Sequence, residues 1–213
     1  MDGIILAQVQ LRFTINMPSG RIEFGKTELL VICLVITAIT ALVCLITKKN
    51  VIRRIFTALM AMYLVVAASL TVFPIYIRCS DIAARFAESG WRLRDCISLV
   101  PFKTGFEVNA ILNFLLTVPF GFLLPLVRRR CGLACAAAAG LAFGICVELI
   151  QLVTAYLQGF SYRVVDTTDI ICNFAGTLLG WLLIFGITGL IKKLGGEKVA
   201  DGGLLGYVIQ TRF

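Results

Sequence analysis

The stretch LACAAAAGLAFGICVELIQLVTAYL, residues 133–157, decides the fold of this chain. It is apolar over nearly its whole length, and its one charged side chain, Glu148, lies three residues before an amide, Gln151. About 20 apolar residues in a helix cross the roughly 30 Å hydrocarbon core of a bilayer. The stretch therefore predicts a membrane-spanning helix, and it raises the question of why Glu148 and Gln151 lie within one.

Composition and four further apolar runs extend this prediction to the whole chain. The 213 residues are 59% hydrophobic and 15% charged, with a mean hydropathy of +0.94, which leaves too few polar residues to coat a soluble globule. The other runs span residues 28–46, 55–77, 109–127 and 169–191. We expect an all-α, polytopic membrane protein built as a bundle of five transmembrane helices, with the lipid bilayer as its main partner.

Lys and Arg residues predict the orientation of the bundle. The short connections after the first, third and fifth runs are dense in positive charge, at Lys48, Lys49, Arg53, Arg54, Arg128, Arg129, Arg130, Lys192, Lys193 and Lys198. Cytoplasmic loops carry such an excess. We therefore expect an outside N-terminus and a cytoplasmic C-terminus. The net charge of +8 is then a topological signal, and with no nucleic-acid-binding motif we expect no nucleic acid as a partner.

The runs also divide the chain into regions. Residues 1–27 form an N-terminal extracytoplasmic segment, 28–77 two transmembrane helices, 78–191 an extracytoplasmic loop with three transmembrane helices, and 192–213 a cytoplasmic tail. Residues 195–213 are rich in glycine and lack a long apolar run, so we expect them to form a loose extension. Small-xxx-small patterns at Gly140/Gly144 and Gly176/Gly180 predict close packing between the fourth and fifth helices.

The eight cysteines show no CxxC pair. Five lie within apolar runs and are expected to behave as small hydrophobic residues: Cys33, Cys44, Cys135, Cys146 and Cys172. Cys79 and Cys96 share the predicted external loop, where a disulfide between them is one alternative.

Polar residues of the last three helices converge on the extracytoplasmic side. Glu148 lies roughly 22 Å along the fourth helix from its cytoplasmic start, so it falls in the outer half of the bilayer. Asn113 lies roughly 6 Å below Asn109 on one helix face, and Asp169 and Asn173 form a second pair with the same spacing. Ionisable groups at membrane depth usually face a partner or a watery cavity, which is one answer to the question that Glu148 raises.

The same residues suggest a division of roles. The chain contains no histidine, so acid–base chemistry would have to use carboxylates, and Glu148, Asp166 and Asp169 are the catalytic candidates. The ligand-binding candidates are Asn109, Asn113, Gln151, Arg163 and Asn173. Structural alternatives are hydrogen bonds between helices for the amides, and ion pairing of Arg163 with Glu148 or Asp169. We expect no metal centre and no cofactor.

A family resemblance covers about residues 96–183. It is carried by Asn113, PFGFLLP at 119–125, Glu148-x-x-Gln151, and Arg163-x-x-Asp166-x-x-Asp169-x-x-x-Asn173-x-x-Gly176-x-x-x-Gly180. This order resembles the VanZ family of bacterial membrane proteins. The resemblance implies a multi-pass protein of the bacterial plasma (inner) membrane and, through the founding member of the family, a link to low-level teicoplanin resistance. It implies no cofactor and no reaction. Ser98 departs from the family pattern, in which an Asn is expected.

Three functions remain open at this point. The first is an envelope protein whose outer pocket engages a lipid-linked cell-wall precursor or a lipoglycopeptide. The second is an intramembrane enzyme acting on a lipid-phosphate or glycolipid, with Glu148 as acid or base, Arg163 holding an anionic headgroup, and the two Asp residues orienting Arg163 or binding a divalent cation. The third is a small transporter in which Glu148 relays protons.

Overall fold

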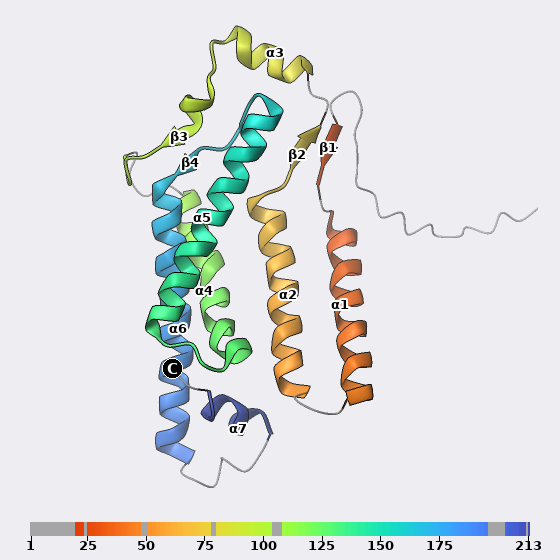
Figure 1. Cartoon of the computed structure of the whole chain (residues 1–213), viewed down its shortest axis with the longest axis vertical. Helices are drawn as coiled ribbons and strands as arrows, with labels where there is room; N and C mark the ends of the chain where they lie inside the picture. The colour runs from red at the N-terminus through yellow and green to blue at the C-terminus, as the bar shows by residue number, and fades with distance from the viewer. Residues whose placement is uncertain are drawn as a thin grey trace, which may run out of the picture.

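The computed structural model describes residues 20–23, 25–47, 51–77, 80–103, 108–195, 203–211 and 213. Within these residues, five helices are long and apolar enough to cross a membrane. They are α1 (Lys26–Thr47), α2 (Val51–Thr71), α4 (Val108–Arg128), α5 (Leu133–Gln158) and α6 (Thr167–Gly195), which run side by side (Figure 1). The predicted all-α bundle of five membrane-spanning helices is confirmed.

The second helix ends earlier than the apolar run does. Its last residue is Thr71, and residues Ile75–Ile77 form strand β2, which pairs antiparallel with β1 (Gly20–Ile22). Pro74 explains the difference, since proline disfavours a helical conformation in the residue before it. The apolar composition of the run had concealed this break.

Short elements close the end of the bundle that carries the polar residues. Helix α3 (Ser80–Glu88) and the 3-10 turn Leu93–Cys96 lead into β3 (Ile97–Ser98). Strand β3 pairs in parallel with β4 (Val165–Asp166), so that Ser98 lies opposite Asp166 (Figure 1). The pairing of β3 with β4 joins the loop before α4 to the connection between α5 and α6.

Glycines bring α6 against two neighbours at once. A Cβ added to Gly176 or Gly180 would collide with backbone carbonyl oxygens of α4, those of Phe114 and Val118. On the other side, a Cβ at Gly140 would lie 2.8 Å from Thr177 Cβ. The predicted α5–α6 contact exists at Gly140 and Gly144, but Gly176 and Gly180 face α4 instead, so the prediction for that second pair is wrong. Neither motif reveals in sequence which of two neighbouring helices it faces.

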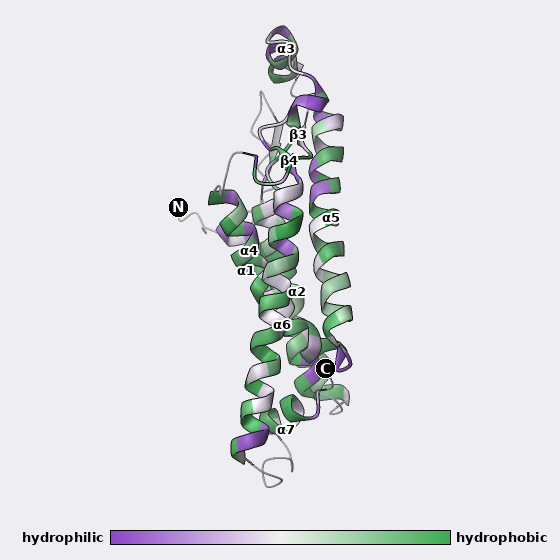
Figure 2. Ribbon diagram, turned by 90° about the vertical axis from the view of Figure 1, so that its left-hand side faces the viewer, coloured by the Kyte–Doolittle hydropathy of each residue, from purple (hydrophilic) through white to green (hydrophobic). Residues whose placement is uncertain are grey.

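The outer surface of the bundle is apolar. Helix α1 buries none of its residues, and Leu45 and Ile46 are 73% and 72% exposed. Figure 2 shows hydrophobic residues along the helices and hydrophilic ones concentrated near their ends. This is the distribution that a lipid environment requires.

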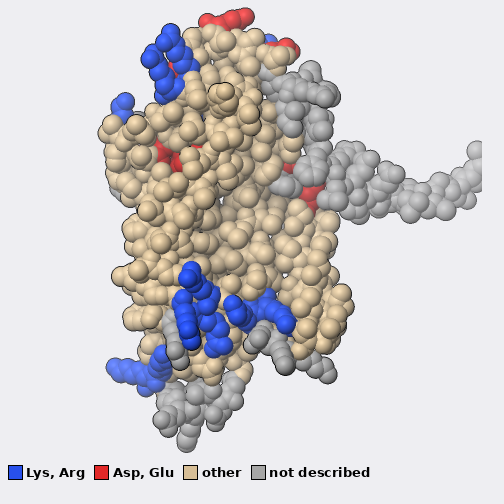
Figure 3. All heavy atoms as spheres, viewed as in Figure 1, with Lys and Arg blue, Asp and Glu red and all other residues tan. Residues whose placement is uncertain are grey.

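Positive charge gathers at the end where α1 joins α2 and α4 joins α5. Figure 3 shows Lys and Arg side chains clustered there, on the face in view. Arg53 and Arg54 lie at the start of α2, and Arg128 ends α4. Other Lys and Arg residues lie at the opposite end, above the bundle, together with acidic side chains.

The last described segment is packed against the basic end of the bundle. Helix α7 (Gly203–Ile209) lies at the base, where the Tyr207 hydroxyl donates to the Leu126 carbonyl oxygen at 2.6 Å. Val208 shares a buried cluster with Leu126 and Ile184, and the Phe213 ring contacts Trp181 edge-on. The expectation of a loose tail is therefore wrong for these residues. The segment is too short to span a bilayer, but it buries Gly206 and Val208. The Tyr207 hydroxyl satisfies a carbonyl oxygen that the end of α4 leaves open.

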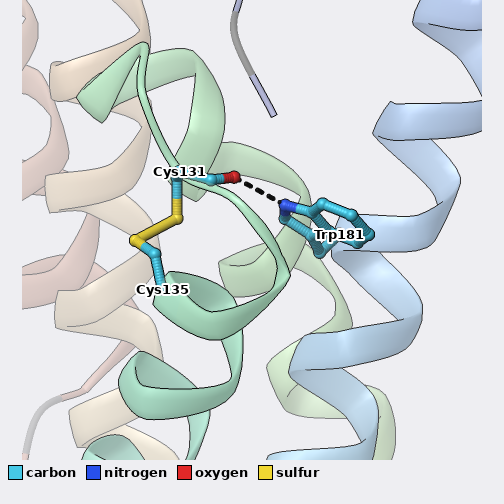
Figure 4. The surroundings of a disulfide bond; sticks show 3 residues. All are labelled: Cys131, Cys135 and Trp181. Carbon is cyan, nitrogen blue, oxygen red and sulfur yellow. Dashed lines mark hydrogen bonds between the residues drawn. A yellow bond between two sulfur atoms is a disulfide. The ribbon is translucent and has the colours of Figure 1, made fainter.

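A disulfide links Cys131 to Cys135 at the same end (Figure 4). The indole N–H of Trp181 donates to the Cys131 carbonyl oxygen at 2.8 Å. Cys135 was expected to be a simple hydrophobic residue, and this is wrong because the turn into α5 brings residues four apart together. Cys96 is a free, buried thiol, whereas Cys79, its alternative partner, lies outside the described residues.

We predict that Gly176→Ala destabilises the protein and that Gly186→Ala does not. A methyl group at position 176 meets the Phe114 carbonyl oxygen, whereas one at position 186 has no atom within 4 Å. Overpacking of this kind costs on the order of 1–3 kcal/mol. Thermal unfolding of both variants in detergent measures the difference. Equal melting temperatures would show that α4 and α6 are not held at this distance.

Candidate functional site

Backbone turns place the polar loop between α5 and α6 over the end of the bundle. Helix α5 ends at Gln158 and is capped by Gly159, whose φ of 73° is readily adopted by glycine. The Gly159 N–H donates to the carbonyl oxygens of Ala155 and Tyr156. At the other end of the loop, the carboxylate of Asp166 accepts from the Thr168 N–H at 2.7 Å. Asp166 thereby satisfies an open donor at the start of α6.

Arg163 is fixed by the end of α2. Its guanidinium donates to the carbonyl oxygens of Thr71 at 2.7 Å, Phe73 at 2.9 Å and Leu70 at 3.1 Å. The Gln151 amide also donates to Thr71 O, at 3.0 Å. These carbonyls have no intrahelical donors beyond the helix end, and they lie at its negative pole, so a cation is favoured there. Burial lowers the pKa of Arg163, and the charges of Glu148 and Asp169 oppose that shift.

Glu148 is buried on the other side of the same loop. Its side chain is 3% exposed, and one carboxylate oxygen, Oε2, accepts from the Asp166 N–H at 2.9 Å. The second oxygen, Oε1, has no hydrogen-bond partner within the described chain. Glu148 lines a cavity of about 140 Å³ together with Ser98, Leu99 and Asp166. Glu148 and Arg163 form no direct ion pair among the described residues. The ion pair considered in the sequence analysis therefore does not position Glu148.

A larger cavity of about 870 Å³ lies between α2, α4 and the loop. Six of the eight predicted site residues line it: Asn109, Asn113, Gln151, Arg163, Asp166 and Asp169. Its other walls are mainly apolar side chains of α2 and α4. Asp166 lines both cavities, so the loop is a partition between them.

Asn173 lies apart from both cavities. It is 1% exposed, and neither its amide nitrogen nor its amide oxygen has a partner within the described residues. An added Cβ at Gly144 of α5 would lie 3.3 Å from the Asn173 Cβ. A buried amide without partners costs roughly 1–3 kcal/mol. Its position between α5 and α6 makes it a polar group inside the helix interface, not part of the cavity wall.

Three residues that the sequence analysis did not single out complete the larger cavity. Tyr63 of α2 lines it and donates its hydroxyl hydrogen to the Leu116 carbonyl oxygen at 2.8 Å. Thr71 supplies the acceptor for Arg163, and the Thr168 hydroxyl accepts from the Phe102 N–H at 2.9 Å. Tyr63 and Thr71 belong to a generic apolar run, and backbone acceptors carry no signature in the sequence. The order of side chains alone does not reveal them.

The lining of the larger cavity suits the binding of a molecule that is polar at one end. Among the described residues, no group of three or more His, Cys, Asp or Glu side chains is placed to hold a metal ion. The larger cavity instead offers amides, carboxylates and one guanidinium at one end and hydrocarbon at the other. Such a cavity can hold a molecule that is itself polar at one end and apolar at the other.

Fold and site together define a polytopic membrane protein with a polar cavity near one end of its helices. The family model described as VanZ/LLP1 matches residues 60–191, more than half of the chain. The protein therefore belongs to the VanZ/LLP1 family, which confirms the resemblance. The match extends beyond residues 96–183, back into α2 and further along α6. Comparisons with curated proteins and with solved structures give no match.

We predict that Arg163→Lys lowers stability although it keeps the charge. A lysine has one nitrogen and cannot reproduce the forked contacts to three carbonyl oxygens. The expected loss is about 1–3 kcal/mol. Arg85→Lys, on the exposed face of α3, is the matched control and should unfold like the parent protein in a detergent melting experiment. Equal stability of the two variants would mean that the guanidinium does not hold the end of α2.

Proposed function

We propose that this protein acts in the bacterial cell envelope by binding a lipid-linked cell-wall precursor or a lipoglycopeptide in the larger cavity, and that it thereby contributes to teicoplanin tolerance. The observation that carries the proposal is the cavity of about 870 Å³, with six polar site residues at one end and apolar walls on α2 and α4. Membership of the VanZ/LLP1 family supports an envelope role. Binding requires no cofactor.

The proposal places the cavity on the outer side of the plasma membrane, with the N-terminus outside and the C-terminus in the cytoplasm. Its support is the density of Lys and Arg in the short connections at the other end. A ligand of the envelope would then reach the cavity from the outer leaflet.

Chemical labelling of single cysteines tests this orientation. In a parent without native cysteines, a cysteine at Ser89 should react with a membrane-impermeant thiol reagent added to intact cells, and one at Arg130 should not. Both positions are exposed, and they lie at opposite ends of the bundle. The cysteine-free parent must keep its expression level, because it lacks the Cys131–Cys135 disulfide. The reverse labelling pattern would place the cavity on the cytoplasmic side.

Filling the cavity tests the link to teicoplanin. We expect expression of the protein in a susceptible bacterium to raise the tolerated teicoplanin concentration, and Val66→Trp to remove that increase at an equal amount of membrane protein. Val66 lines the cavity and is 38% exposed. Val43 on α1 is also 38% exposed but does not line it, so Val43→Trp is the matched control and should behave like the parent. Full tolerance with Val66→Trp would refute a role for the cavity.

A second candidate, an intramembrane enzyme or proton relay that depends on Glu148, is favoured by one observation. The carboxylate oxygen Oε1 is buried, faces no partner in the described structure, and belongs to a residue that lines the smaller cavity. A carboxylate so placed can exchange a proton with a molecule in that cavity.

Substitution of the carboxylate separates this candidate from a structural role. Glu148→Gln keeps an acceptor for the Asp166 N–H but cannot transfer a proton as a carboxylate does. We expect normal expression and loss of teicoplanin tolerance, normalised to protein in the membrane fraction. Asp166→Asn and Asp169→Asn are expected to behave in the same way, and Glu28→Gln on α1 to have little effect. Unchanged tolerance with Glu148→Gln would exclude acid–base chemistry at this residue.

A further inference from the structure

The excess positive charge of the chain belongs to three segments that join or follow helices at one end of the bundle. Residues 48–54, 128–130 and 192–212 contain eleven of the twenty Lys and Arg residues but only two of the twelve acidic ones, Glu197 and Asp201. The rest of the chain has nine Lys and Arg against ten Asp and Glu, so it is close to neutral. The field of the protein therefore attracts anions at this basic end and not at the other.

Arg53 and Arg128 lie at neighbouring positions where α2 begins and α4 ends. Arg53 is exposed and donates one N–H, that of Nε, to the Val127 carbonyl oxygen at 3.1 Å. Arg128, the residue after Val127, is also exposed, and within the described residues its side chain makes no hydrogen bond or ion pair. Two guanidinium groups with N–H donors left over are thus presented together at the surface.

Arg129 shows what an engaged cation looks like at this end. Its guanidinium lies 4.7 Å from the centre of the Tyr207 ring and donates to the Gln210 side-chain oxygen at 3.2 Å, so it holds α7. Arg53 contacts α4 through a single N–H, and Arg128 contacts nothing in the part of the chain that the structure describes. The basic end therefore divides its arginines between internal packing and the surface.

Exposed apolar side chains set the depth of these cations. Leu45 and Ile46 end the apolar part of α1, Leu194 follows the lysines of α6, and Leu204 and Leu205 lie on α7, all of them exposed. Apolar side chains exposed next to Lys and Arg mark the boundary between the hydrocarbon core and the headgroup layer. Lipid phosphates lie in that layer, so they are within reach of these guanidinium groups without a pocket. Figure 3 shows Lys and Arg side chains gathered on the face in view at this end.

The chemistry of the guanidinium group selects among headgroups. Guanidinium binds a phosphate through two parallel N–H donors, which gives a stronger contact than a single point charge. A zwitterionic headgroup brings its own cation into the positive field of the basic end, whereas a headgroup with net negative charge does not. A soluble anion lacks the acyl chains that can lie against the exposed apolar flank of the bundle.

We infer that the basic end is a docking surface for an anionic phospholipid, whose phosphate is held between Arg53 of α2 and Arg128 of α4. The acyl chains lie along the lipid-facing side of the bundle. This surface is separate from both cavities, which lie towards the opposite end, so the inference does not rest on the proposed function.

Competition between two phospholipids tests the inference. The purified full-length protein in detergent is mixed with equal amounts of a phosphatidylglycerol and a phosphatidylcholine that have identical acyl chains, and retained lipid is counted by native mass spectrometry. We expect the phosphatidylglycerol to be retained about ten-fold or more over the phosphatidylcholine, because each cation near an anionic lipid contributes about five-fold. Equal retention, a preference for phosphatidylcholine or no retention would overturn the inference.

Variants assign the preference to the two arginines. Arg53→Gln with Arg128→Gln should lower it to about two-fold or less, at about five-fold for each cation removed. Arg85→Gln with Arg92→Gln removes the same charge from two exposed positions at the opposite end, so it is the matched control and should keep the parent preference. A preference that survives the first pair, or that falls equally with both pairs, would overturn the assignment.

A single substitution keeps the test decisive if Arg53→Gln impairs folding. Arg128→Gln breaks no contact within the described residues, so the variant should melt like the parent. Its preference for phosphatidylglycerol should fall about five-fold. An unchanged preference would mean that Arg128 does not contact the headgroup.

Inorganic phosphate separates a lipid surface from a general anion site. Added in large excess over lipid, it should displace no more phosphatidylglycerol than sodium chloride does at the same ionic strength. Stronger displacement by phosphate would overturn the lipid assignment. Val66→Trp, which fills the larger cavity, should keep the phosphatidylglycerol preference even where it removes teicoplanin tolerance. The two proposals can therefore fail independently.

Discussion

The close approach of α6 to α4 is the contact on which the rest of the structure depends. Gly176 and Gly180 allow the backbone of α6 to lie against the carbonyl oxygens of Phe114 and Val118, where any side chain would collide. In a bilayer, where lipid is as apolar as a leucine side chain, such direct packing replaces the hydrophobic effect as a source of helix association. This packing also fixes the position of α4 relative to α6. Asn113 of α4 and Asp169 of α6 line the same cavity, so the packing sets their relative positions.

Arg163 then joins α2 to this core. Without the guanidinium, the carbonyl oxygens at the end of α2 would have neither a following helical turn nor a cation near them. Arg163 holds α2 at its end, and the Tyr63 hydrogen bond to the Leu116 carbonyl oxygen holds α2 against α4 further along. Residues at both contacts line the larger cavity. Arg163, which the sequence analysis assigned to ligand binding, thus contributes to the site by holding the end of α2 in place.

Sequence patterns predicted the number, length and apolar character of the membrane helices because hydrocarbon thickness constrains them directly. They also predicted that six polar residues converge at one end of the bundle, because the depth of a helical residue follows from the rise per residue. These six residues line one cavity: Asn109, Asn113, Gln151, Arg163, Asp166 and Asp169. They did not predict that Glu148 faces a different cavity or that Asn173 faces none. Those outcomes depend on helix rotation, which packing contacts decide. The packing of Tyr207 and Val208 against the bundle and the Cys131–Cys135 disulfide likewise depend on tertiary contacts that no local pattern encodes.

The polar groups without a hydrogen-bond partner within the described residues fall into two kinds. Asn173 is fully enclosed, so whatever satisfies it must be as small as a water molecule or must await a change in packing. Glu148 Oε1 is also buried, but its residue lines the smaller cavity of about 140 Å³. Asn109 and Asn113 face a volume of about 870 Å³ that is open to the flank of the bundle, so a large molecule can reach them. The enclosed carboxylate therefore suits proton exchange and the open amides suit recognition. Asp166, which lines both cavities and donates its N–H to Glu148, is the residue through which one could influence the other.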